Sequence, residues 1–142
     1  MTLLDAYALV ALLGDEPAAS EVEAILRAGE AGITVVNLAE AIDVTSRVHG
    51  IPQEEVRATL APLLGEAIAV VIQDEAAAWR AAELRQTHYE RRSSALSLAD
   101  CLLIAAVGER DEVATADRVV ARVARSDGRR VVALPDSTGT RP

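Results

Sequence analysis

The sequence predicts an α/β fold, a single domain built on a central parallel sheet of about five strands. Short runs of aliphatic and β-branched residues alternate with longer segments of helical periodicity along nearly the whole chain. With 142 residues, of which 51% are hydrophobic, the chain is long enough to bury one core. Because strands separated by helices pair in parallel and are buried on both faces, we expect a three-layer α/β/α sandwich.

The first half of the chain supplies three of the expected strands. Its elements are, in order, a strand over 2–4, helices over 6–14 and 17–29, a strand over 32–36, helices over 37–50 and 52–65, and a strand over 67–72. Gly14, Gly29 and Gly50 stand where three of these helices end, and Pro17 stands where one begins. Glycine and proline favour those positions.

The second half supplies two strands and three helices. Its elements are a helix over 74–92, a helix over 97–108, a strand over 112–115, a helix over 117–128 and a last strand over 129–134. No linker or repeat divides the chain, so we expect one domain over residues 1–135. Residues 136–142 are polar and rich in turn-forming residues, and we expect a disordered tail there.

The composition excludes several classes of protein. Lysine is absent and all 14 basic residues are arginine, which excludes Schiff-base enzymes and P-loop proteins. Haloacid-dehalogenase-like phosphatases and response-regulator receivers also need a lysine. The single cysteine, Cys101, rules out an internal disulfide and fits a reducing compartment. We expect a cytoplasmic protein with no membrane association, since neither a signal peptide nor a membrane-spanning run is visible.

The charge is unevenly distributed along the chain. The formal net charge is −8. Residues 1–75 contain 13 acids and 3 arginines, a net of −10, whereas residues 76–142 contain 9 acids and 11 arginines, a net of +2. The overall field repels nucleic acid, so any contact with phosphate must be local, and we expect it to use arginines of the second half.

Four acidic residues fall at similar places relative to the expected strands. Asp5 follows the first strand and Asp117 the fourth, while Glu40 and Asp100 lie in the first turns of helices. Parallel sheets hold their sites outside the carboxyl ends of the strands. We therefore expect the four side chains to lie together at one end of the sheet.

Each acid, taken alone, is equally consistent with a helix cap. The segments "NLAE" (37–40) and "SLAD" (97–100) both resemble capping boxes, and Asp5 and Asp117 have the positions of ordinary N-caps. The functional interpretation rests on the set, and on the apolar run around Asp100, where an ionised carboxylate needs compensation.

Four carboxylates in one pocket repel one another. Two such charges about 4 Å apart cost roughly 4 kcal/mol at an effective dielectric constant of 20. Either some of them keep a proton, with a raised pKa, or a divalent cation neutralises them. Oxygen-only ligation favours Mg²⁺ or Mn²⁺ over zinc. An acidic cluster with such ions commonly hydrolyses phosphodiester bonds.

Three segments together resemble the PIN-domain ribonucleases, and among them the VapC-type toxins of bacterial toxin–antitoxin pairs. "LLDAYALVALL" resembles the opening strand and acid of the family, and "ITVVNLAEAIDV" its second strand and acid. "LSLADCLLIAAVGERDEVATADR" is the most specific segment, because it contains Asp100 and a Thr-x-Asp at Thr115 to Asp117. Order and spacing match from residue 2 to 134.

The resemblance implies a PIN-like nuclease domain over 1–135 with the first strand in the centre of the sheet. It implies Mg²⁺- or Mn²⁺-dependent cleavage of RNA, with Asp5, Glu40, Asp100 and Asp117 as the catalytic and metal-binding residues. Thr115 would supply a hydroxyl beside them. Asn37, which stands where serine or threonine is frequent in the family, would supply an amide. A homodimer and a small antitoxin that covers the pocket are also implied.

Four arginines are candidates for contact with RNA phosphates. Arg118 directly follows Asp117, and Arg85, Arg91 and Arg92 form the densest basic cluster before Asp100. A solvated helix face is the structural alternative for that cluster. Two other functions stay open: a PIN-like scaffold that binds partners without catalysis, and a PIN nuclease that acts in RNA maturation or on DNA without being a toxin.

Overall fold

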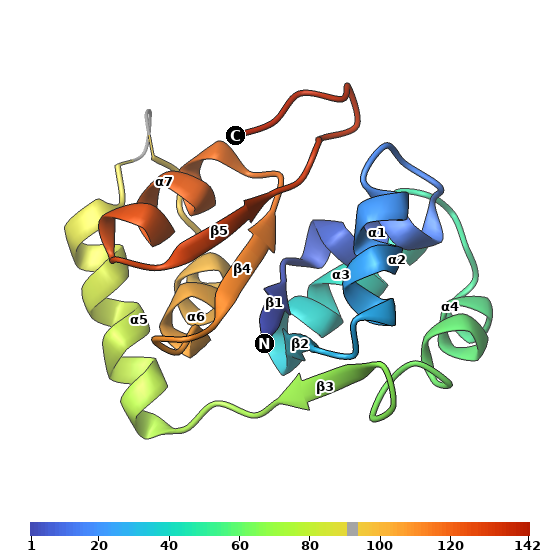
Figure 1. Ribbon diagram of the computed structural model, residues 1–142, viewed down its shortest axis with the longest axis horizontal. Helices are drawn as coiled ribbons and strands as arrows, with labels where there is room; N and C mark the ends of the chain where they lie inside the picture. The colour runs from blue at the N-terminus through green and yellow to red at the C-terminus, as the bar shows by residue number, and fades with distance from the viewer. Residues whose placement is uncertain (91–93) are drawn as a thin grey trace.

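The structure is a computed structural model that describes residues 1–90 and 94–142 (Figure 1). Its helices and strands follow one another in the order β1 (Thr2–Leu4), α1 (Ala6–Leu13), α2 (Ala19–Arg27), β2 (Ala31–Thr34), α3 (Val35–Arg47), α4 (Gln53–Leu60), β3 (Ile68–Val71), α5 (Glu75–His88), α6 (Leu98–Ala106), β4 (Glu112–Thr115), α7 (Arg118–Ser126) and β5 (Arg130–Ala133). The predicted α/β class is confirmed.

The five strands form one parallel sheet in the order β3-β2-β1-β4-β5. The central strand β1 pairs with β2 on one side, Thr2 opposite Ala31, and with β4 on the other, Thr2 opposite Glu112. The strand order therefore reverses at β1. In an open parallel sheet, that reversal leaves a crevice at the carboxyl ends of the strands.

Helices cover both faces of the sheet, so the sandwich has three layers (Figure 1). A hydrophobic core lies on each face of the sheet. Successive residues of β1 pack into opposite cores, because side chains alternate across a strand. Leu4 packs with residues of α1, α2, α3 and α4, whereas Leu3 packs with residues of α5, α6 and α7. Both leucines are buried, and so are Val113 and Ala114, which face opposite cores from β4.

The second strand is shorter than the sequence suggests. It ends at Thr34, and the predicted strand residues Val35 and Val36 instead begin α3, where both are exposed. The buried hydroxyl of Thr34 accepts a hydrogen bond from the backbone N–H of Asn37, at 3.1 Å. The capping box predicted over 37–40 is therefore wrong, because Thr34 is the N-cap and the β-branched pair belongs to the helix.

Helix ends otherwise follow the glycines. Gly29 and Gly50 have positive φ angles, 73° and 71°, which a side chain would strain. The helix predicted over 52–65 ends earlier, at Leu60, and turns lead into β3. The long helix predicted over 74–92 ends at His88, after which Glu90 and Ser94 form an antiparallel bridge.

The segment 136–142, predicted to be a disordered tail, is described in the structure. Arg141 forms an ion pair with Glu21 of α2, with Nη2 2.6 Å from Oε1, and also donates to the carbonyl of Ala133. The limits of the domain and the disorder of this segment stay predictions. Among the helices of the described residues, none has the length and apolar character that crossing a membrane requires.

Candidate active site

A cavity of about 220 Å³ lies at the carboxyl end of the sheet, and all four predicted acids line it. Asp5 comes from the end of β1 and Asp117 from the end of β4. Glu40 and Asp100 come from α3 and α6. The cavity residues are Asp5, Ala6, Tyr7, Val10, Glu40, Val44, Asp100 and Asp117. The strands thus bring together carboxylates that are up to 112 positions apart in the sequence.

Asp5 is the most buried of these acids, with 7% of its surface exposed. Its Oδ2 accepts a hydrogen bond from the hydroxyl of Thr115 at 2.6 Å, and its Oδ1 accepts one from the backbone N–H of Ala6 at 2.7 Å. The pKa of Asp5 is raised to about 7, first by burial and then by the charges of Asp100 and Glu40, while the two hydrogen bonds act in the opposite direction.

Thr115 connects two of the acids. Its fully buried hydroxyl donates to Asp5 and accepts a hydrogen bond from the backbone N–H of Asp117, at 3.0 Å. A hydroxyl has a single proton, so these two bonds use it as donor and acceptor at once. Thr115 therefore orients Asp5 and fixes the start of α7, whereas the role beside a metal that the resemblance implies for it stays a prediction.

Asp100 is compensated by the start of its own helix. Its Oδ2 accepts from the backbone N–H of Ser97 at 2.6 Å, while its own N–H donates to Oγ of Ser97 at 3.0 Å. This reciprocal pair is the capping box predicted over 97–100. The cap explains how a carboxylate is tolerated in an apolar helix, and it leaves Oδ1 of Asp100 for another partner.

Asp117 and Glu40 are the exposed members of the set. Asp117 caps α7, because its Oδ1 accepts from the backbone N–H groups of Val119 and Val120 at 2.5 and 3.0 Å. The pKa of Glu40 is raised above its usual range. Burial is the largest cause, and the negative charges of Asp100 and Asp43 add to it. Glu40 can move its carboxylate at little cost because its side chain is exposed, whereas moving that of Asp117 breaks its two hydrogen bonds with the start of α7.

The donor set fits a hard divalent cation, but the side chains are held apart. Four carboxylates facing one cavity are the oxygen ligands that Mg²⁺ and Mn²⁺ prefer. In the residues that the structure describes, no three acidic, histidine or cysteine side chains are yet close enough together to hold an ion. Asp5, Asp100 and Asp117 are all held by hydrogen bonds, so the exposed Glu40 is the member of the set that can turn inward most easily to bind an ion.

Asn37 lies outside the cavity. It is fully buried under the start of α3, where its Oδ1 accepts from the hydroxyl of Thr34 at 2.5 Å. Its side-chain nitrogen is buried, with no hydrogen-bond partner among the described residues. The structure thus ties Asn37 to the Thr34 cap, and its predicted role as a support for the acids stays a prediction.

The arginines predicted to contact RNA lie in different surroundings. Arg118 is exposed at the start of α7, next to Asp117. Arg85 is half-buried, donates to the carbonyl of Leu96 at 2.6 Å and stacks 4.4 Å from the ring centre of Tyr89. Through these contacts Arg85 stabilises the loop before Asp100. Arg91 and Arg92 lie outside the described residues.

Changing Arg85 to methionine should destabilise the fold. The carbonyl of the buried Leu96 would lose a charge-assisted hydrogen bond, which costs about 1 to 3 kcal/mol. Urea unfolding of Arg85→Met should show this loss, while Arg110→Met, at an exposed position, should unfold like the original protein. Equal midpoints for the two variants would show that Arg85 does not hold this loop.

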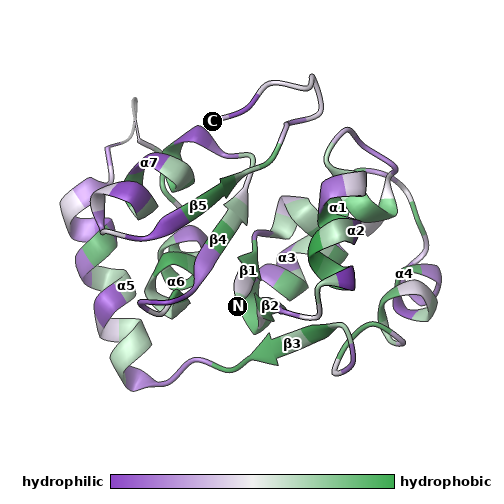
Figure 2. Cartoon of the chain, viewed as in Figure 1, coloured by the Kyte–Doolittle hydropathy of each residue, from purple (hydrophilic) through white to green (hydrophobic). Residues whose placement is uncertain are grey.

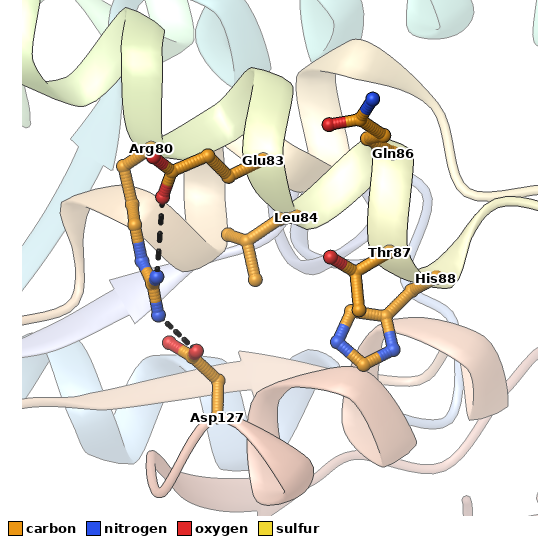
Figure 3. A pocket seen from close by; sticks show the side chains of 7 residues that line it. All are labelled: Arg80, Glu83, Leu84, Gln86, Thr87, His88 and Asp127. Carbon is orange, nitrogen blue, oxygen red and sulfur yellow. Dashed lines mark hydrogen bonds and ion pairs between the residues drawn. The ribbon is translucent and has the colours of Figure 1, made fainter.

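A second cavity, of about 330 Å³, lies between α5 and the end of α7 (Figure 3). Arg80 contacts both Glu83 and Asp127 there, so each carboxylate in this cavity already has a counter-charge (Figure 3). The cavity residues are Arg80, Glu83, Leu84, Gln86, Thr87, His88 and Asp127. It contains no cluster of carboxylates comparable with the first cavity, which remains the candidate active site.

The acid cavity also has apolar walls that sequence reasoning missed. Val10 and Val44 line it beside Tyr7. A signal was present, because residues four positions apart share a helix face. Val44 lies four residues after Glu40 on α3, and Val10 lies four residues after Ala6 on α1.

Comparisons with known proteins agree with this architecture. A family model described as the PIN domain matches residues 2–126. A chain in a toxin–antitoxin complex from Klebsiella pneumoniae has a similar fold, with a TM-score of 0.58 and 20% sequence identity over 82% of this chain and 87% of that one. No curated protein matches the sequence. Because the family model spans most of the chain, including all four cavity acids, this protein belongs to the PIN domain family.

Proposed function

We propose that this protein is a metal-dependent endoribonuclease of the VapC type, the toxin of a toxin–antitoxin pair. The observation on which this rests is the cavity at the carboxyl end of the sheet, lined by Asp5, Glu40, Asp100 and Asp117 in a chain of the PIN domain family. No basic side chain of the described residues lines that cavity, so within that part of the chain the acids have no counter-charge there. A bound cation would supply one.

The four acids would hold Mg²⁺ or Mn²⁺. The bound ion would supply an activated water and neutralise charge on the phosphate during in-line hydrolysis. The chain's own residues prepare the site for it. Thr115 fixes the carboxylate of Asp5, and Ser97 fixes that of Asp100. With a pKa of about 7, Asp5 holds a proton for much of the time at neutral pH, which limits repulsion before a cation binds.

The partners follow from the same proposal. The substrate is RNA, and the inhibitor is a small antitoxin that covers the acid cavity. The antitoxin is supported by the resemblance to VapC toxins and by the fold shared with a chain of a toxin–antitoxin complex. A homodimer and a cytoplasmic location, expected from the sequence, belong to this proposal as well.

One observation favours a second function. As the side chains stand, no three ligand-type groups in the described part of the chain are close enough together to hold an ion. A PIN-like scaffold that binds partners without catalysis would have an acid cavity that never closes around a metal. The two functions differ in whether the protein binds Mn²⁺ at all.

The proposal is tested with purified protein and a pool of total small RNA. Fragments should form with Mg²⁺ or Mn²⁺ and disappear with EDTA, and isothermal calorimetry should detect Mn²⁺ binding to the protein alone. Mapping the fragment ends then identifies the target RNA. A folded protein that neither cleaves RNA nor binds Mn²⁺ contradicts the proposal and leaves the scaffold.

A further inference from the structure

The outer face of α7 has a row of three arginines that begins at the acid cavity. Arg118, Arg122 and Arg125 are separated by four and three residues and are all exposed. At 100° per residue they fall within an arc of about 60°, and they extend along about 10 Å of the helix axis. We call Arg118, Arg122 and Arg125 the α7 arginine row.

The opposite face of α7 explains why the row is so regular. Val120, Ala121, Val123 and Ala124 are buried against the sheet, so the polar residues are restricted to the outer side. The resulting contrast between hydrophilic and hydrophobic residues on this short helix is visible in Figure 2. The guanidinium groups of the row therefore point into solvent from a rigid support.

The α7 arginine row has no counter-charge in ion-pair range among the described residues. Arg80 and Arg129, in contrast, both pair with Asp127 where α7 ends. The charge of Arg118 acts on Asp136, whose pKa is lowered mainly by its hydrogen bonds with Thr138 and Thr140, but no salt bridge forms between the two.

The row is unfavourable for the helix that contains it. A cation at the first position of a helix opposes the helix dipole, and like charges four residues apart repel. Arg118 has the first defect, and its spacing from Arg122 produces the second. In a chain of net charge −8, this unpaired positive surface is the feature that an anionic ligand would match.

We propose that the α7 arginine row binds the phosphate backbone of single-stranded RNA and leads the strand into the acid cavity. This inference rests on the proposed ribonuclease function. Asp117 lines the cavity and Arg118 is the next residue, so the row begins beside one of the carboxylates. Such backbone contacts supply affinity without reading sequence.

The test is the binding of a fluorescein-labelled single-stranded RNA of mixed sequence, measured by anisotropy in EDTA so that no cleavage occurs. Arg122→Gln/Arg125→Gln should bind about tenfold more weakly than the original protein, and the slope of log K against log salt should fall by about 1.4. Arg122→Lys/Arg125→Lys should bind like the original protein, because it keeps both positive charges.

The control is Arg27→Gln/Arg57→Gln, which removes the same charge from exposed positions on α2 and α4. It should bind RNA within about twofold of the original protein. Equal affinities for the two glutamine variants, or no binding by the original protein, would overturn the inference. A protein that binds RNA through the row but never cleaves it with Mn²⁺ would instead defeat the proposed function and leave the row's role intact.

Discussion

An Asp100→Asn protein should fold normally and yet cleave RNA on the order of 100-fold more slowly, or not at all. The capping box needs only an oxygen to accept the N–H of Ser97, and the amide oxygen of asparagine supplies it. What the substitution removes is a negative charge from the cavity that it shares with Asp5, Glu40 and Asp117. The affinity for Mn²⁺ should fall with the activity.

Asp15→Asn is the matched control for this loss. Asp15 is exposed, lies outside the cavity and has a φ of 51°, a conformation that asparagine tolerates well. Cleavage rates of the two variants with Mn²⁺ and their thermal unfolding should be compared side by side. If Asp100→Asn unfolds whereas Asp15→Asn does not, Asp100 is chiefly a helix cap.

Replacing Asp5 with asparagine should stabilise the protein at alkaline pH in the absence of metal. The pKa of Asp5 is about 7 in the folded protein and 3.8 in its unperturbed state, a rise caused first by burial. The folded state therefore holds a proton that the unfolded state has already released between about pH 4 and 7. Over that interval the free energy of unfolding falls as the pH rises, by up to roughly 4 kcal/mol.

Urea unfolding in EDTA at pH 4.5 and pH 8 measures this effect. Asp5→Asn should resemble the original protein at the lower pH and exceed it by a few kcal/mol at the higher one. Adding Mn²⁺ at pH 8 should stabilise the original protein more than the variant, because the cation compensates the negative charge of Asp5, which the variant lacks. Parallel pH profiles in EDTA would show that Asp5 is ionised in the fold at no cost.

The sheet and the meeting of the four acids could be predicted because both follow from one pattern. Alternating strands and helices impose parallel pairing, and parallel pairing puts the residues that follow β1 and β4 at the same edge. Asp5 and Asp117 needed no further information to be placed together. Glu40 and Asp100 followed because each lies in a helix that begins beside that edge.

Other features depend on contacts that no local pattern contains. The start of α3 is decided by the buried hydroxyl of Thr34, which outweighs the strand preference of Val35 and Val36. The contact of Arg85 with the carbonyl of Leu96 crosses a loop, so a cluster of arginines in the sequence concealed a structural residue. Distances between carboxylates depend on side-chain rotamers, which the strand order leaves free.

The central position of β1 has a consequence for how the protein is made. This strand of three residues is flanked by β2 and by β4, whose pairing with it begins at Glu112, and Asp5 donates its backbone N–H to the carbonyl of Ala114. Contacts between such distant residues cannot form on the ribosome until the later segment has emerged. The acid cavity is thus assembled only after the segment from Glu112 to Asp117 has emerged from the ribosome.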